Sequence, residues 1–256
     1  MIGLQKFLLF HLLMCLEQNV LGSEIIHGEK APENSMLYMA SVQNNRGHVC
    51  GGFLVSEDFV ITAAHCEKNN LTRVVLGNHN LKKVDNNRHR SVVKKCKHPS
   101  YKTPASGNDI MLLKLSKKAR LDNRVQIIPL PRTDNKLKDR EVCRVAGWGF
   151  TETGGKVVNM LRAVDVPLVN LEVCKTNWKY ISFNLPPNVI CAGGYETDKG
   201  FCQGDSGGPL VCNGLAVGVV SFNMRKICDY PNVPNVYTDI SKYLPWIHNI
   251  LKKKTC

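Results

Sequence analysis

The sequence predicts an all-β protein with a helix at its C-terminal end. Most of the chain consists of short apolar runs separated by polar and glycine-rich turns, a pattern typical of the strands of a β-barrel or a β-sandwich. The clearest runs are residues 49–55, 59–62, 110–113, 144–148, 164–166 and 215–220. A chain of 256 residues is long enough for one large unit or for two small domains that share a core.

The predicted helix lies within residues 241–256. Apolar side chains recur there at helical spacing, namely Tyr243, Leu244, Ile247, Ile250 and Leu251. Ser241 is a suitable cap, Pro245 is compatible with a first turn, and lysines 252–254 suit the C-terminal end of the helix dipole. Residues 121–131 separate two strand-rich halves, and we interpret them as the connection between two domains.

Cysteine content and the N-terminus both favour an oxidising compartment. The chain has 11 cysteines, a count that the reducing cytosol does not favour. Lys6 precedes an apolar stretch over residues 7–10 that resumes at residues 12–14 after His11, and the small residue Gly22 follows. This stretch is shorter than the roughly 20 residues that a membrane span needs. We therefore interpret residues 1–22 as a signal peptide, so Cys15 is lost when it is cleaved off. We expect a secreted mature chain that does not span a membrane.

The formal net charge is +13, which attracts polyanions without sequence preference. Basic residues gather in three clusters: Lys82-Lys83, then Arg88-His89-Arg90 with Lys94, Lys95 and Lys97, and Lys252-Lys253-Lys254. These clusters are candidate sites for a sulfated glycosaminoglycan. The alternative is that they only keep the surface soluble and protect strand edges. We expect no specific nucleic-acid partner.

The most informative segment reads Gly204-Asp205-Ser206-Gly207-Gly208-Pro209. A serine hydroxyl is a weak nucleophile unless a base takes its proton. Glycines let the backbone turn sharply, so the amides of Gly204 and Ser206 can point at one spot and stabilise an oxyanion. Taken alone, the segment is also compatible with a glycine-rich turn and a capping serine.

Two further segments supply the missing groups. His65 stands beside Cys66 at the end of an apolar strand, and Asp109 precedes the apolar run 110–113. A buried aspartate there can hold the tautomer of an imidazole and stabilise the imidazolium. Each residue alone has an ordinary structural explanation, but the order His, Asp, Ser in one chain is hard to attribute to chance.

These segments resemble the chymotrypsin-like serine proteases, from Ile25 to about Leu251. Further matching segments are Cys50-Gly51-Gly52, Gly147-Trp148-Gly149, Val220-Ser221-Phe222, Val236-Tyr237-Thr238 and Trp246-Ile247. The resemblance implies two six-stranded antiparallel β-barrels, at residues 25–127 and 128–240, and a serine endopeptidase that needs no cofactor. It also implies that His65 is the general base, that Asp109 orients it with the help of Ser221, and that Ser206 is the nucleophile.

The resemblance further implies a zymogen. Asp205 adjoins the nucleophile, and burying its charge unpaired is strongly unfavourable. In the family, the mature chain begins at the position of Ile25, and its new α-ammonium pairs with the aspartate at the position of Asp205. The dipeptide Ser23-Glu24 stands between the signal peptide and Ile25. Such an acidic activation dipeptide resembles granzymes, mast-cell proteases and neutrophil elastase, and it favours storage in secretory or cytotoxic granules.

The family's disulfide pattern implies four bridges: Cys50–Cys66, Cys143–Cys212, Cys174–Cys191 and Cys202–Cys228. Cys96 and Cys256 remain. Their regions can lie near each other in this fold, so we predict a fifth bridge between them. The alternative is that Cys256 is a free or intermolecular thiol.

The resemblance places the substrate pocket at Gly200, Phe201, Gln203, Ser221, Phe222, Asn223 and Asn235. Gly200 occupies the floor position where trypsin-like enzymes have an aspartate, so cleavage after Lys or Arg is not expected. The bulky Phe201 makes the pocket shallower. A narrow uncharged pocket favours small or medium apolar side chains before the cut bond, as in elastase. A chymase-like preference for Phe or Tyr is the rival interpretation.

The remaining predictions concern ligands and partners. The family's calcium loop has no acidic ligands here, because Asn78, His79 and Asn80 follow Gly77, so we predict no metal. Asn70-Leu71-Thr72 is the only glycosylation sequon. We expect a monomer that meets protein or peptide substrates and serpin-type inhibitors. The alternative function is a non-enzymatic, heparin-binding relative, which the complete set of catalytic residues disfavours.

Overall fold

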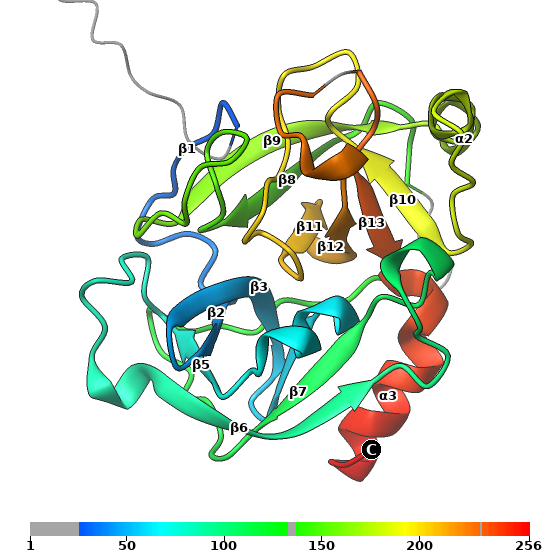
Figure 1. Ribbon diagram of the computed structural model, residues 1–256. Coiled ribbons are helices and arrows are strands. Elements are labelled where there is room, and N and C mark those ends of the chain that lie inside the picture. Colours follow the sequence, from blue (N-terminus) through cyan, green and yellow to red (C-terminus); the bar gives the residue numbers. More distant parts are fainter. Residues whose placement is uncertain (1–25, 133–136, 231) are drawn as a thin grey trace, which may run out of the picture.

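The computed structural model describes residues 26–132, 137–230 and 232–256. It confirms the expected fold class, with two antiparallel β-barrels stacked on each other and a C-terminal helix (Figure 1). The proposed signal peptide at residues 1–22, the dipeptide Ser23-Glu24 and Ile25 lie outside the described residues.

The first barrel contains six strands that close in the order β2-β3-β4-β7-β6-β5. Their bounds are β2 Met39–Asn44, β3 Gly47–Ser56, β4 Phe59–Thr62, β5 Arg73–Leu76, β6 His89–Lys97 and β7 Met111–Leu115. Large apolar side chains fill the interior, including the fully buried Phe53, Ile61 and Leu113. The register pairs Thr62 of β4 with Met111 of β7, so the segments that follow β4 and precede β7 lie at the same end of the barrel.

The second barrel is a sheet in the order β9-β10-β13-β12-β11-β8, closed because β8 also pairs with β9. Its strands are β8 Val142–Gly147, β9 Arg162–Val169, β10 Val189–Ala192, β11 Pro209–Cys212, β12 Leu215–Phe222 and β13 Val236–Asp239. The two-residue strand β1, Glu29–Lys30, pairs with β9. Fully buried side chains such as Val145, Leu210 and Tyr237 form the core of this barrel.

The helix α3, Leu244–Lys253, has Pro245 in its first turn. Ser241 is not its cap, because the Ser241 hydroxyl donates to Asp239, whose carboxylate caps the preceding 3-10 turn η5, Ile240–Tyr243. A second helix, α2 at Leu171–Tyr180, was not expected. Five of its ten residues are polar, and the side chain of Asn170 caps it. No helix in the described parts of the chain is long and apolar enough to cross a membrane.

The helix α3 packs on the first barrel although it follows the second (Figure 1). Tyr243, Ile247 and Ile250 belong to the same buried cluster as Leu112 of β7. The C-terminal segment therefore holds the two halves of the chain together.

The described chain contains five disulfides: Cys50–Cys66, Cys96–Cys256, Cys143–Cys212, Cys174–Cys191 and Cys202–Cys228. Cys256 is thus bonded to Cys96 of β6. The bond fixes the end of the chain to the first barrel.

Candidate active site

His65 and Asp109 meet at the end of the first barrel. His65 belongs to the 3-10 turn η1, Ala64–Asn69, which follows β4, and Asp109 lies two residues before β7. The Nδ1 atom of His65 lies 2.7 Å from Oδ2 of Asp109, and the His65 backbone N–H donates to Oδ1 at 2.9 Å. Asp109 is 1% exposed. A buried carboxylate bound at both oxygens fixes the ring and favours a proton on Nδ1.

The second barrel holds Asp109 from the other side. The Ser221 hydroxyl on β12 donates to Oδ2 of Asp109 at 2.6 Å, and the Thr238 hydroxyl on β13 donates to its main-chain carbonyl at 3.0 Å. Both hydroxyl groups are buried with the aspartate. The orientation of His65 therefore depends on contacts from both barrels.

Ser206 lies in the loop before β11 and lines the same cleft as His65. Its main-chain carbonyl accepts a hydrogen bond from the N–H of Gly51 on β3 at 2.9 Å, which ties the loop to the first barrel. No hydrogen bond joins the Ser206 hydroxyl to the His65 ring in this structure. Such contacts are often long in ligand-free sites and tighten when substrate binds.

The backbone around Ser206 presents two free amides. The N–H groups of Asp205, Gly207 and Gly208 donate to carbonyls within the protein, whereas among the described residues those of Gly204 and Ser206 have no acceptor. Gly204 has φ +97°, which an L side chain rarely adopts. Two unpaired amides beside a serine can bind a developing oxyanion.

Asp205 is fully buried behind this loop. Its carboxylate accepts from the N–H of Gly149 at 2.8 Å and from the N–H of Cys202 at 2.9 Å. A Cβ atom at Gly149 would lie 2.5 Å from Cγ of Asp205, and a Cβ atom at Gly147 would lie 2.1 Å from Oδ1 of Asp205. Both positions must therefore be glycine to accommodate the carboxylate. Among the described residues no cation pairs with Asp205, and burial raises its pKa to about 7.

His48, for which no sequence pattern predicted a role, supports the loop from the first barrel. Its Nε2 donates to the Gly204 carbonyl at 3.0 Å, and its Nδ1 lies 2.8 Å from the Ser41 hydroxyl. Since a carbonyl only accepts, the neutral ring carries its proton on Nε2 and accepts from Ser41. Burial lowers the pKa of His48 to about 4, so the ring stays neutral at physiological pH.

The cleft has a volume of about 710 Å³. Of the residues assigned to the pocket, these line the cleft: Phe201, Gln203, Ser221, Phe222 and Asn223. Phe201 is only 3% exposed and packs edge-on against Tyr237, with ring centroids 5.2 Å apart. The amide of Asn223 donates to the Ile227 carbonyl at 3.1 Å, which fixes this wall.

Gly200 and Asn235 do not line the cleft and lie buried behind it. A Cβ at Gly200 would lie 2.2 Å from Nδ2 of Asn235 and 2.7 Å from the Tyr230 hydroxyl. Tyr230, which sequence reasoning missed, donates its hydroxyl hydrogen to the Phe201 carbonyl at 2.7 Å. The space that the floor of a deep pocket would need is therefore filled.

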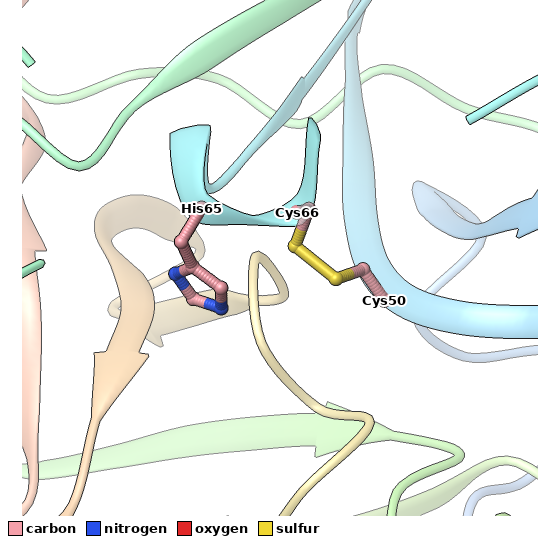
Figure 2. Close-up of side chains that lie close together, drawn as sticks. All are labelled: Cys50, His65 and Cys66. Atoms are coloured by element: carbon pink, nitrogen blue, oxygen red, sulfur yellow. A yellow bond between two sulfur atoms is a disulfide. The ribbon is translucent and has the colours of Figure 1, made fainter. Parts of the chain in front are cut away.

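Cys50, His65 and Cys66 come close enough together to suggest a metal site, since their possible ligand atoms lie within 4.8 Å of one another. Figure 2 shows that the two sulfur atoms are joined in a disulfide between β3 and the turn that carries His65. A disulfide has no thiolate to offer a metal ion. The bridge is better understood as a brace for the turn.

A two-barrel fold with a histidine, an aspartate and a serine at one cleft is typical of serine endopeptidases. Comparison with known proteins shows the family. The chain belongs to the trypsin family of serine endopeptidases, whose family model, described as Trypsin, matches residues 25–247. Granzyme-like protein 2 of Rattus norvegicus is 41% identical over 252 residues, which cover 96% of this chain and 97% of that protein. Duodenase-1 of Bos taurus is 40% identical and Mast cell protease 3 of Ovis aries 39%, each with 90% of both chains covered. These relatives confirm the resemblance to the granzyme and mast-cell protease group.

Proposed function

We propose that this serine endopeptidase acts through His65, Asp109 and Ser206. Ser206 attacks the carbonyl carbon of the cut bond while His65 takes its proton at Nε2, and His65 then gives that proton to the leaving amine. Water then attacks the acyl-enzyme while His65 takes its proton, and His65 gives that proton to the Ser206 oxygen as it leaves. The free amides of Gly204 and Ser206 support the assignment of the oxyanion site, and the hydrogen bonds around Asp109 support its orienting role.

The preferred side chain before the cut bond is small or medium and apolar. The observation that carries this proposal is the closed floor: the buried Phe201 lines the cleft, and Tyr230 and Asn235 fill the space beside Gly200. Of the residues that the structure describes, Glu67 is the single carboxylate that lines the cleft, and it forms an ion pair with Lys97. An arginine or lysine side chain therefore finds neither the depth nor the counter-charge that it requires.

A panel of peptides that differ only in the residue before the cut bond tests this preference. We expect kcat/KM for Val, Ala, Leu or Met to exceed that for Arg or Lys at least tenfold, because pocket size and desolvation discriminate by about 1–3 kcal/mol. Phe and Tyr measure the chymase-like alternative. Faster cleavage after Arg than after Val or Leu would refute the pocket argument.

Activation by removal of Ser23-Glu24 fits the environment of Asp205. Ile26 is buried in one cluster with Cys202, Cys228 and Tyr230, which places the start of the described chain beside the Asp205 loop. A free α-ammonium at Ile25 would supply the cation that Asp205 lacks. We propose that the precursor is secreted or stored in granules and becomes active when Ile25 becomes the first residue. The five disulfides support an oxidising compartment.

A fluorophosphonate probe tests activation. A chain that begins at Ile25 should be labelled at Ser206 at least ten times faster than one that begins at Ser23, and Ser206→Ala should abolish labelling in both.

The pKa of Asp205, raised above its unfolded value, means that the folded longer chain binds more protons than its unfolded state between about pH 4 and 7. Its stability should fall as pH rises through that window. The Ile25 chain should not show this fall, so the gap in melting temperature should widen toward pH 7. Equal labelling of the two chains would contradict the proposal.

Two proposals concern modification and partners. Asn70 is exposed at the end of η1 and has φ +54°, so a glycan at its sequon would project into solvent.

The basic clusters support binding of a sulfated glycosaminoglycan by the active protease. Elution from heparin resin well below physiological salt would exclude that partner.

A further inference from the structure

Three lysines line the cleft that contains His65 and Ser206. Lys68 belongs to η1, Lys102 lies between β6 and the turn η3 at Pro104–Ser106, and Lys226 ends the turn η4 at Met224–Lys226. All three are exposed. They are far apart in the sequence, so nothing in their spacing indicates that the fold brings them to one cleft.

Among the described residues that line the cleft, no unpaired carboxylate offsets these lysines. Within the described chain, Glu67 is the one carboxylate that lines the cleft, and it is paired with Lys97 of β6. Within the part of the chain that the structure describes, no carboxylate forms an ion pair with Lys68, Lys102 or Lys226. Charges of one sign around a cleft focus the electric field and raise the local concentration of ligands with the opposite charge. The rim of this cleft therefore favours anionic ligands.

The lysines lie along both directions in which a bound polypeptide must leave Ser206. Of the residues proposed for the pocket of the side chain before the cut bond, Asn223 lies three residues from Lys226, and both line the cleft. The leaving amine takes its proton from His65, so the segment after the cut bond passes the turn that carries Lys68. Acidic side chains on either flank of the cut bond would thus come near a lysine.

We propose that the protease selects segments with acidic residues flanking the cut bond, in addition to an apolar residue before it. The proposal rests on the proposed function, because it assumes that a polypeptide binds across Ser206. The substrate class is accordingly an acidic polypeptide. The rim lysines Lys68, Lys102 and Lys226 act in binding and take no part in the chemical step.

Exposed ion pairs contribute little individually and are screened by salt. Together, three such lysines should raise kcat/KM for an acid-flanked peptide about tenfold at low ionic strength, mainly through a lower KM. The effect should fall to about twofold in roughly 0.5 M NaCl, where the Debye length is only a few ångströms.

The test uses three peptides with the same residue before the cut bond and with Glu, Gln or Lys at two positions on each side. The chain beginning at Ile25 should cleave the Glu peptide about ten times more efficiently than the Gln peptide, and the Lys peptide least efficiently. Equal kcat/KM for all three peptides would overturn the inference and leave the proposed function intact. If no peptide is cleaved at all, the proposed function fails and the inference fails with it.

A matched pair of variants separates the rim from the net charge. The triple change Lys68→Gln, Lys102→Gln and Lys226→Gln should abolish the preference for Glu, so that the ratio of kcat/KM for the Glu peptide to that for the Gln peptide falls to about one. The control changes Lys83, Lys117 and Lys179 to Gln; all three are exposed, and none lines the cleft. It removes the same charge and should keep the preference. If the control loses the preference as fully as the rim variant, overall charge is responsible and the inference is wrong.

Discussion

Asp109→Asn is expected to lower kcat about 10⁴-fold on the best peptide of the panel. The carboxylate now accepts hydrogen bonds from the backbone N–H and Nδ1 of His65 and from the Ser221 hydroxyl. An asparagine has one acceptor oxygen. If that oxygen stays with the His65 backbone, the amide NH₂ faces Nδ1 and forces the proton of the neutral ring onto Nε2. A ring with a proton on Nε2 cannot take the proton of Ser206.

Ser221→Ala is the matched control for this prediction. It removes one hydrogen bond from the same Asp109 oxygen but leaves the carboxylate charge and the His65 tautomer unchanged. We expect a loss of no more than about 100-fold, since one hydrogen bond to a charged group contributes about 1.5–3 kcal/mol and about 1.4 kcal/mol is tenfold in rate. Steady-state kinetics and thermal melting of both variants separate catalysis from stability. A loss below about 100-fold in a folded Asp109→Asn variant would contradict the assigned role of Asp109.

The sequence locates the candidate triad because each member is attached to a recognisable strand signal. His65 ends the apolar run of β4, Asp109 begins that of β7, and Ser206 stands among glycines before β11. Strand pairing then brings the first two together, since Thr62 lies opposite Met111. Local pattern and barrel closure are therefore sufficient to predict that the His65 and Asp109 segments meet.

Other parts of the site depend on packing that no local pattern encodes. Tyr230 lies in a loop, yet its hydroxyl reaches the Phe201 carbonyl and closes the space beside Gly200. His48 contacts the Gly204 carbonyl across 156 residues of sequence. The helix α2 escaped prediction because half of its ten residues are polar and only Cys174 and Trp178 are buried. For Tyr230 and His48, a contact distant in sequence decides the structure.

Removal of the Cys96–Cys256 bridge is expected to have the largest effect on stability. This disulfide joins residues 160 positions apart, and a loop of that length corresponds to roughly 5 kcal/mol in the chain-entropy description. The other bridges already constrain the unfolded chain, so we expect the double variant Cys96→Ser/Cys256→Ser to lose about 3–4 kcal/mol. At about 2–4 °C per kcal/mol, the melting temperature should fall by roughly 10 °C.

Contacts beside the bridge provide a control for this prediction. Lys94 donates to the Cys256 carbonyl, and Lys114 donates to the Lys254 carbonyl. Both contacts are exposed, so Lys114→Gln should change stability by no more than about 0.5 kcal/mol. If that variant falls as far as the double cysteine variant, the tail contacts and not the disulfide hold the chain end.

The same double variant should keep its activity at low temperature. Cys96 pairs with Leu112 within the first barrel, and α3 keeps its buried contacts through Ile247 and Ile250 without the covalent link. The hydrogen bonds around Asp109 come from His65, Ser221 and Thr238, none of which touches the bridge. We therefore expect kcat/KM at 25 °C to remain within about twofold of the unmodified enzyme. A large loss of activity in the folded variant would show that the C-terminal anchor also positions the catalytic cleft.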